Sequence, residues 1–314
     1  MSLLGPLLVV FFGLSQAFRD VYLAGIFQRV DAFMVLFIAF GLSTILFGVI
    51  ATIRTPEQWR ILKGHGGSIF AMNLTTAMAW SSYFFALTWL EPAAVNMLHS
   101  GMGPLTVVVM GLMGFRLAKA PNLGRIEGWS YVGLALSMAA LWWVVLTGRS
   151  GLPVTNIAAT AGGLAALMVS GSAITISMMY SKRMSDRGIN AEMITTLRYF
   201  GLIAVAGVMT WQHKGWTGIE SATDLATISV LATAVMILPL FALQVGITRT
   251  SPLTTHVIRA LGPVFVFGLE QVDGRMSYSL PTLICILAYS FFVIVSNIAH
   301  GWHEDTPKVA KAAA

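Results

Sequence analysis

The sequence predicts an all-α polytopic membrane protein, with ten transmembrane helices that form two inverted five-helix repeats and with both termini in the cytoplasm. Three observations predict this fold: the composition, the apolar segments and an internal repeat. Hydrophobic residues make up 56% of the 314 residues, charged residues only 10%, and the mean hydropathy is +0.77. Soluble domains usually carry about 25% charged residues, and disorder requires low hydrophobicity. The composition therefore excludes both an ordinary soluble enzyme and a disordered chain.

Ten apolar segments are long enough to cross a bilayer, which requires about 20 mostly apolar residues. Proline opens the fourth and ninth segments, where its missing N–H does not disturb a helix. The first segment is expected to be a retained helix, because no Lys or Arg precedes it and no clear signal-peptidase site follows it. With approximate boundaries, the segments are Leu3–Phe27, Phe33–Ile53, Ser68–Leu90, Pro92–Phe115, Trp129–Leu146, Ile157–Ser181, Ala191–Trp211, Leu225–Thr248, Pro252–Gln271 and Leu280–His300.

The distribution of basic residues predicts the orientation. With the N-terminus inside, the cytoplasmic loops and tail hold twelve of the Lys and Arg residues, and the opposite side holds four. Cytoplasmic loops of membrane proteins are enriched in Lys and Arg, so this bias places both termini in the cytoplasm. It also accounts for the net charge of +6 without a nucleic-acid partner. The other three arginines, Arg19, Arg198 and Arg259, lie inside apolar segments.

Short matches between the two halves predict the repeat. Residues 31–34 match 190–193, residues 103–105 match 262–264, and residues 116–117 match 275–276, all at an offset of 159 residues. Each half, 1–151 and 152–314, would hold five helices. Because five is odd, the second half must cross the bilayer in the opposite direction to the first. Inverted repeats are typical of transporters, in which two similar halves alternate access to a shared central site.

Several motifs resemble the repeated module of the drug/metabolite transporter superfamily, in its EamA-like branch. Within that superfamily the chain is most similar to YddG-type exporters of aromatic amino acids. The family usually carries Gly-Glu-Arg after the fourth and ninth helices, whereas this chain has Phe115 and Gly274 at the Glu positions. The resemblance implies a multi-pass transporter of the bacterial inner membrane. The matching motifs are Ala86–Pro92, Gly103–Leu105, Gly114–Leu117, Thr250–Pro252, Leu261–Phe265 and Gly274–Met276.

Polar residues inside a bilayer are costly and therefore mark candidate functional positions. Asn96 and His99 are three residues apart on the fourth segment and share a helix face, as do His256 and Arg259 on the ninth. His99 and Arg259 each lie seven residues past a segment-opening proline, roughly 10 Å into the helix at 1.5 Å per residue. We expect these four side chains to meet near the midplane and to bind the carboxylate of a zwitterion. The alternative is that they satisfy one another.

The third segment is expected to supply an apolar wall beside these polar groups, although an aromatic stripe in a membrane helix can also be simple packing. Three residues of the eighth segment, one of them a methionine, would face this wall, and the flexible methionine could adapt to varied substrates. Arg198 and Tyr199 are expected to point inward from the seventh segment. The residues of the wall are Asn73, Ala77, Trp80, Tyr83 and Phe84, and those facing it are Met236, Leu240 and Gln244.

Other charged residues are expected to lie away from this site. Arg19 and Asp20, late in the first segment, are expected to reach back to the interface. Glu91 and Glu270 fall towards helix ends, so proton coupling would need a histidine or be absent. Cys285, in an apolar segment, is expected to be a small buried hydrophobe.

These observations predict an exporter of aromatic and other apolar amino acids that works without ATP, because no phosphate-binding loop motif is present. No cofactor or metal is expected, and the chain would be a monomer or a weak homodimer. The second substrate class to consider is an amphipathic organic cation or drug. An intramembrane hydrolase using Ser100 is disfavoured, because Ser100 and His99 are adjacent on a helix and diverge by about 100°. Ser100 is kept as a residue of the substrate site.

Overall fold

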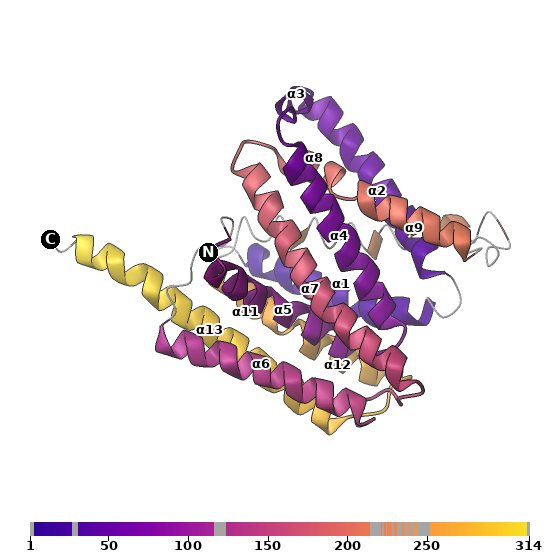
Figure 1. Ribbon diagram of the computed structural model, residues 1–314, viewed down its shortest axis with the longest axis vertical. Helices are drawn as coiled ribbons and strands as arrows, with labels where there is room; N and C mark the ends of the chain where they lie inside the picture. The colour runs from indigo at the N-terminus through magenta and orange to yellow at the C-terminus, as the bar shows by residue number, and fades with distance from the viewer. Residues whose placement is uncertain are drawn as a thin grey trace.

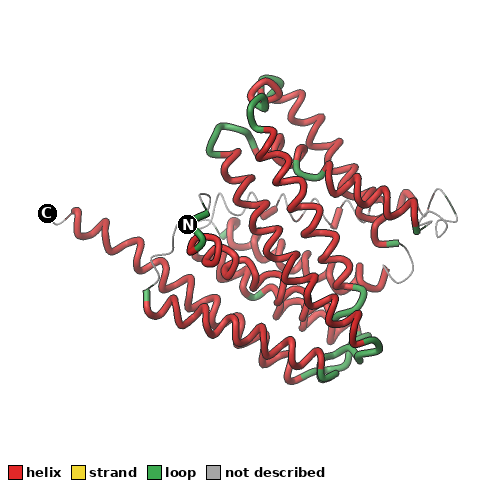
Figure 2. Tube along the Cα trace, in the orientation of Figure 1, coloured by secondary structure: helices red, strands yellow, loops and turns green. Residues whose placement is uncertain are grey.

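The computed structural model describes residues 3–26, 31–115, 124–213 and 252–312, together with isolated residues between 221 and 243. Across these residues the backbone is helical, joined by short loops and without strands (Figure 2). The helices are α1 (Leu4–Ile26), α2 (Ala32–Arg54), α3 (Gln58–Ile61), α4 (Gly66–Leu87), α5 (Pro92–Leu112), α6 (Arg125–Leu146), α7 (Ile157–Ser185), α8 (Ala191–Leu197), α9 (Phe200–Gln212), α11 (Pro252–Ala260), α12 (Gly262–Asp273) and α13 (Leu280–Ala312).

Seven membrane spans, built from α1, α2, α5, α6, α7, α8 with α9, and α13, are long and apolar enough to cross a bilayer. They match seven of the ten predicted segments. The third predicted segment forms α4, a 22-residue helix that carries several polar side chains. The ninth is divided between α11 and α12, and the eighth lies outside the well-described residues. The chain is an α-helical polytopic membrane protein, as its composition predicts.

Helix ends at or next to the residues matched in the repeat are similar in the two halves. Asp31 precedes α2 and accepts a hydrogen bond from the Met34 amide at 2.9 Å, and Asn190 precedes α8 and accepts one from the Met193 amide at 3.0 Å. Such side chains satisfy amides that have no partner inside the helix. Gly114 follows α5 and Gly274 follows α12, and both have φ of +71°, a left-handed conformation that favours glycine.

The helices pack in antiparallel and crossed pairs (Figure 1). α4 lies along α7, α6 lies along α13, and α2 contacts both α8 and α9. α5 contacts α7 on one side and α12 on the other, and α1 packs against α11 and α12. The largest group of buried apolar side chains is shared by α1, α2, α4, α5, α6, α7, α9, α11, α12 and α13, so the core is common to both halves of the chain.

Two spans are interrupted. Between α8 and α9, Asn73 of α4 donates to the Leu197 carbonyl at 2.6 Å and accepts from the Gly201 amide at 2.9 Å. These bonds satisfy backbone groups that an unbroken helix would pair internally. Between α11 and α12, Pro263 cannot donate to the carbonyl four residues earlier, and Ser290 of α13 donates to the Ala260 carbonyl at 2.9 Å.

The closest backbone approach in the core is at Gly171 of α7. A Cβ added there would lie 2.4 Å from the His99 carbonyl oxygen and 2.5 Å from Met102 Cβ, both on α5. Since neither a carbonyl nor a Cβ can move away easily, only glycine fits this contact. The glycine at position 171 therefore allows α5 and α7 to approach closely, and the position of His99 on α5 depends on this separation.

Replacing Gly171 by alanine is expected to destabilise the protein by about 1–3 kcal/mol, the usual cost of overpacking a core. Thermal unfolding of the purified protein in detergent measures this change. Gly162→Ala, in the same helix, is the control, because its new Cβ would meet only the Phe85 ring at 3.9 Å. Equal melting temperatures for the two variants would contradict the close packing of α5 and α7.

Candidate substrate-binding site

A buried ion pair lies at the centre of the candidate site. Arg19 Nε and Nη2 donate to Asp20 Oδ1 at 2.9 and 2.7 Å, and the two residues are 7% and 0% exposed. The prediction that both reach the membrane interface is wrong. A buried charge is tolerated when its partner is buried beside it, and two adjacent residues of opposite charge meet that condition without help from another helix.

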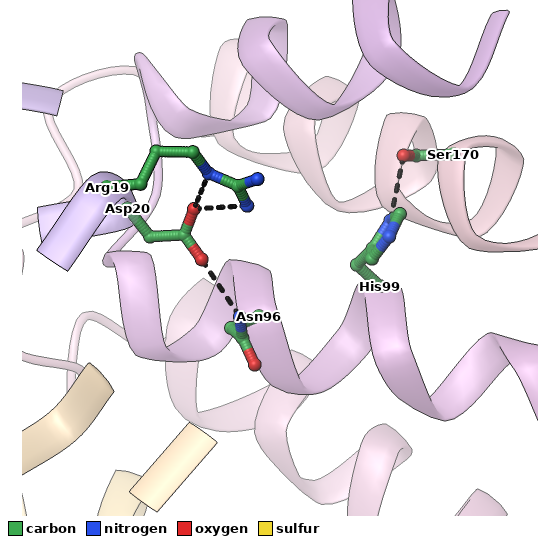
Figure 3. A network of polar contacts seen from close by, with 5 residues as sticks. All are labelled: Arg19, Asp20, Asn96, His99 and Ser170. Carbon is green, nitrogen blue, oxygen red and sulfur yellow. Dashed lines mark hydrogen bonds and ion pairs between the residues drawn. The ribbon is translucent and has the colours of Figure 1, made fainter. Parts of the chain in front are cut away.

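Two further helices hold this pair in place. Asn96 of α5 donates to the second Asp20 oxygen at 2.9 Å, as Figure 3 shows. The Arg19 guanidinium carbon lies 5.4 Å from the Trp80 ring centre and 5.6 Å from that of Tyr83, both on α4. Cation–π contacts of this kind are worth about 2 kcal/mol or more when water is excluded. α1, α4 and α5 therefore meet around one guanidinium.

His99 is oriented by a serine of the second half. Its Nδ1 lies 2.9 Å from Ser170 Oγ of α7, and Ser170 itself donates to the Ala79 carbonyl at 2.7 Å (Figure 3). Because the serine proton is used in that bond, the serine oxygen must accept from His99 Nδ1–H. In the neutral ring this leaves the Nε2 lone pair as an acceptor. Arg19 and Arg259 both lie close enough to act electrostatically on His99.

An aromatic wall continues from this polar cluster. Trp80 stacks on Phe84 with ring centres 5.7 Å apart and contacts Phe40 of α2 at 5.1 Å. Phe40 in turn contacts Tyr199 at 4.6 Å. Trp80 is partly exposed, whereas Ala77, Tyr83, Phe84, Phe40 and Tyr199 are buried. Of the predicted wall, Trp80 is therefore the aromatic residue that offers surface to a ligand, and the others support its ring.

Arg198 lies at the interruption between α8 and α9. Its Nη2 donates to Ser177 Oγ of α7 at 3.2 Å, and its guanidinium carbon lies 5.4 Å from the Tyr199 ring centre. Ser177 also contacts Thr76 of α4 at 2.6 Å. As the residue that follows α8, Arg198 places its charge at the negative end of a helix dipole. The side chain of Asn73, a residue of the predicted wall, forms hydrogen bonds with the backbone of the same interruption and is therefore not free to bind a substrate.

Arg259 is an exposed charged residue close to this polar cluster. It lies in the last turn of α11, also at the negative end of a helix dipole, and its side chain is exposed. Its charge nevertheless acts on His99 of α5 and on Tyr289 of α13, and the Ser100 and Tyr289 hydroxyls approach each other. This exposed cation therefore lies close to both α5 and α13. No carboxylate of the described residues contacts it.

The structure brings Trp80, Tyr83, Asn96, His99, Ser100 and Arg259 to one region of the bundle, as the sequence predicts, with Arg198 and Tyr199 at its edge. Met236, Leu240 and Gln244 lie outside the described residues, as does the side chain of His256. The sequence did not indicate that Arg19, Asp20, Phe40, Ser170 and Tyr289 belong to the site. An adjacent Arg and Asp in an apolar segment was an available signal, since such a pair can be buried as a unit.

Comparisons with known proteins support the fold without naming a function. No family model and no curated protein matches the chain. A solved structure described only as "Crystal structure of protein" is similar, with a TM-score of 0.59 and 15% sequence identity, over 93% of this chain and 96% of that one. At this level of identity the two chains share a fold, and nothing further follows for substrate or mechanism.

Removing the partner of Arg19 is expected to be costly. Asp20→Ala should lower the stability by about 3–5 kcal/mol, because it leaves an unpaired buried charge. The double variant Arg19→Met, Asp20→Ala should recover part of that loss, because no charge then remains at this position. Thermal unfolding of both variants, completed as a double-mutant cycle, measures the coupling. An additive cycle would show that the pair does not stabilise the bundle.

Proposed function

We propose that the chain is an exporter of the drug/metabolite transporter superfamily, EamA-like, that moves aromatic and other apolar amino acids across the bacterial inner membrane. Its ten helices form two inverted repeats with both termini in the cytoplasm, and the halves alternate access to a central site without ATP. A zwitterionic amino acid is the substrate class that matches the chemistry of that site.

The observation that carries this proposal is the exposed Arg259 guanidinium near His99. Arg19 is neutralised by Asp20, whereas Arg259 has no carboxylate partner among the described residues. A substrate carboxylate would supply the missing negative charge through charge-assisted hydrogen bonds. The His99 Nε2 lone pair can accept a hydrogen bond from a substrate ammonium group. The partly exposed Trp80 ring offers a flat apolar surface for the substrate side chain.

Local symmetry supports the inverted repeat. The Asp31 and Asn190 caps occupy matched positions of the two halves, and a glycine with φ of +71° lies at the end of both α5 and α12, one position apart in the repeat. The packing pairs also follow the repeat, since α1 against α11 and α12 corresponds to α7 against α5. The interruption at Leu261 resembles the broken helices that many transporters place at their substrate sites.

Two other functions fit the site less well. An amphipathic cation would gain from Trp80 and Tyr83 but would be repelled by Arg198 and Arg259. A hydrolase using Ser100 needs a histidine that accepts the Ser100 proton, but His99 Nδ1 is bonded to Ser170 and the Ser100 hydroxyl approaches Tyr289 instead. Competition between an organic cation and tryptophan for transport would identify the first, and labelling by a serine-reactive phosphonate the second.

Proteoliposomes containing the purified chain are expected to exchange labelled phenylalanine, tryptophan and methionine faster than empty liposomes. Arg259→Gln should raise the concentration needed for half-maximal exchange by about 10- to 100-fold, because a hydrogen bond to a charged group is worth about 1.5–3 kcal/mol. Arg183→Gln, which changes an exposed arginine at the end of α7, is the matched control. Protein-containing liposomes no leakier than empty ones would refute the proposal.

Trp80→Ala is expected to reduce exchange of tryptophan more than exchange of methionine, because an indole gains most from a stacking surface. Trp143→Ala is the control for loss of a large aromatic residue, since Trp143 is 66% exposed on the outside of α6. Equal effects on both substrates would remove Trp80 from the contact with the substrate side chain.

A further inference from the structure

Two glutamates from different halves of the chain meet at one end of the bundle. Glu91 precedes α5, Glu270 lies near the end of α12, and the residues are 1% and 0% exposed. The prediction that they lie near helix ends holds for the backbone, but their side chains are buried in protein. The two carboxyl groups lie close enough to interact, and the charge of Glu91 acts on Glu270.

Each carboxyl has one oxygen satisfied and one without a partner. Glu91 Oε2 accepts from the Gly151 amide at 2.8 Å and from Thr282 Oγ1 at 3.4 Å, and Glu270 Oε1 accepts from the Ala93 amide at 2.8 Å. Glu91 Oε1 and Glu270 Oε2 are fully buried, and no donor of the described residues reaches them. Two ionised carboxylates would leave both oxygens unpaired and would repel each other. A proton bound to either oxygen donates to the other and removes both costs.

We propose that Glu91 and Glu270 form a proton-binding site, in which one proton held between Glu91 Oε1 and Glu270 Oε2 closes this end of the bundle. The bound proton joins the start of α5 to the end of α12. When the proton leaves to water, two adjacent carboxylates remain and the two helix ends separate. This site would bind a proton whether or not the chain transports amino acids.

The elements that meet at this site explain why a change in one proton can reach both halves. The loop between α6 and α7 is bound here, because the Ser277 amide donates to the Gly151 carbonyl at 3.0 Å and Ser279 Oγ donates to the Arg149 carbonyl at 2.7 Å. A Cβ on Gly151 would lie 2.6 Å from the Ser277 carbonyl oxygen. The connection between the two halves and the start of α13 are therefore packed against the same carboxyl pair.

The charged residues that the structure describes around the site do not pair with the two carboxyl groups, so a proton is the cation that can bind there. Asp20 of α1 adds negative charge near Glu270, and Arg19 is paired with Asp20. Arg275 is paired with Asp273, and the Arg149 side chain is exposed. A metal ion such as Ca²⁺ takes six to eight oxygen ligands, whereas this site has two free oxygens. No group of three or more potential metal ligands occurs among the described residues.

The direction in which the pKa of Glu91 is shifted determines how the stability of the protein depends on pH. Burial raises the pKa of the Glu91 carboxyl, although the Gly151 amide and the Thr282 hydroxyl that donate to it act in the opposite direction. A carboxyl with a raised pKa binds its proton more tightly in the folded than in the unfolded protein. Its stabilising effect is complete in acid and is lost as the pH rises through the raised pKa.

Thermal unfolding of the full chain in detergent, measured from mildly acidic to alkaline pH, tests this site. The wild type should lose melting temperature as the pH rises, and Glu270→Gln should remove most of that loss, because the amide donates to Glu91 Oε1 at every pH. Glu57→Gln, an exposed carboxyl, should behave as the wild type. Equal pH dependence of wild type and Glu270→Gln would overturn the proposal, as would stabilisation by sodium or calcium ions at alkaline pH.

Infrared spectroscopy and thiol labelling test the proton and the opening separately. The wild type should show a protonated-carboxyl band at neutral pH that fades in alkali and is absent in Glu91→Gln, Glu270→Gln. Cys285, the single cysteine, is buried one turn past Thr282 and reports opening of this end. At alkaline pH a maleimide should label Cys285 several-fold faster in the wild type than in Glu270→Gln, with equal rates in mild acid. No band in the wild type, or equal labelling throughout, would overturn the proposal.

Discussion

The requirement that every charge inside the bundle be compensated determines how the central helices are arranged. Arg19 cannot be exposed to lipid, so it lies against Asp20 and under the rings of Trp80 and Tyr83. Asn96 completes the environment of Asp20 and thereby ties α5 to α1. Apolar packing alone would allow these helices to rotate or slide, because one apolar surface fits another about equally well. The polar contacts select a single arrangement.

Helix ends inside the bundle accommodate the other two intramembrane arginines. Arg198 follows α8 and Arg259 lies in the last turn of α11, so each cation is near the negative end of a short helix. The interruptions after these helices free backbone groups, and Asn73 and Ser290 satisfy some of them. Polar backbone and positive charge are thus concentrated in the region where an amino acid carboxylate would bind. The same breaks provide positions at which a half-helix can move.

Two carboxyl sites in this bundle illustrate opposite solutions to burial. Asp20 is paired with a guanidinium and an amide, and it serves as a structural charge. Glu91 and Glu270 have no cation among the described residues, and a proton takes that role. In the first site a neighbouring cation compensates the carboxylate, whereas in the second a shared proton makes one end of the bundle sensitive to pH. The two sites are neighbours, because Asp20 of the central site adds negative charge near Glu270.

Composition and the length of the apolar segments were sufficient to identify a helical membrane protein. A bilayer requires long apolar helices in which the backbone hydrogen bonds are made within the helix. The same local rules identified the caps at Asp31 and Asn190 and the prolines that open α5 and α11. The surroundings of Arg19, Glu91 and Glu270 could not be read from the chain, because burial depends on which helices cover a residue. Likewise, the contact of His99 with Ser170 joins residues 71 positions apart. Such contacts exist only once α5 and α7 have packed at Gly171, and only the folded bundle decides them.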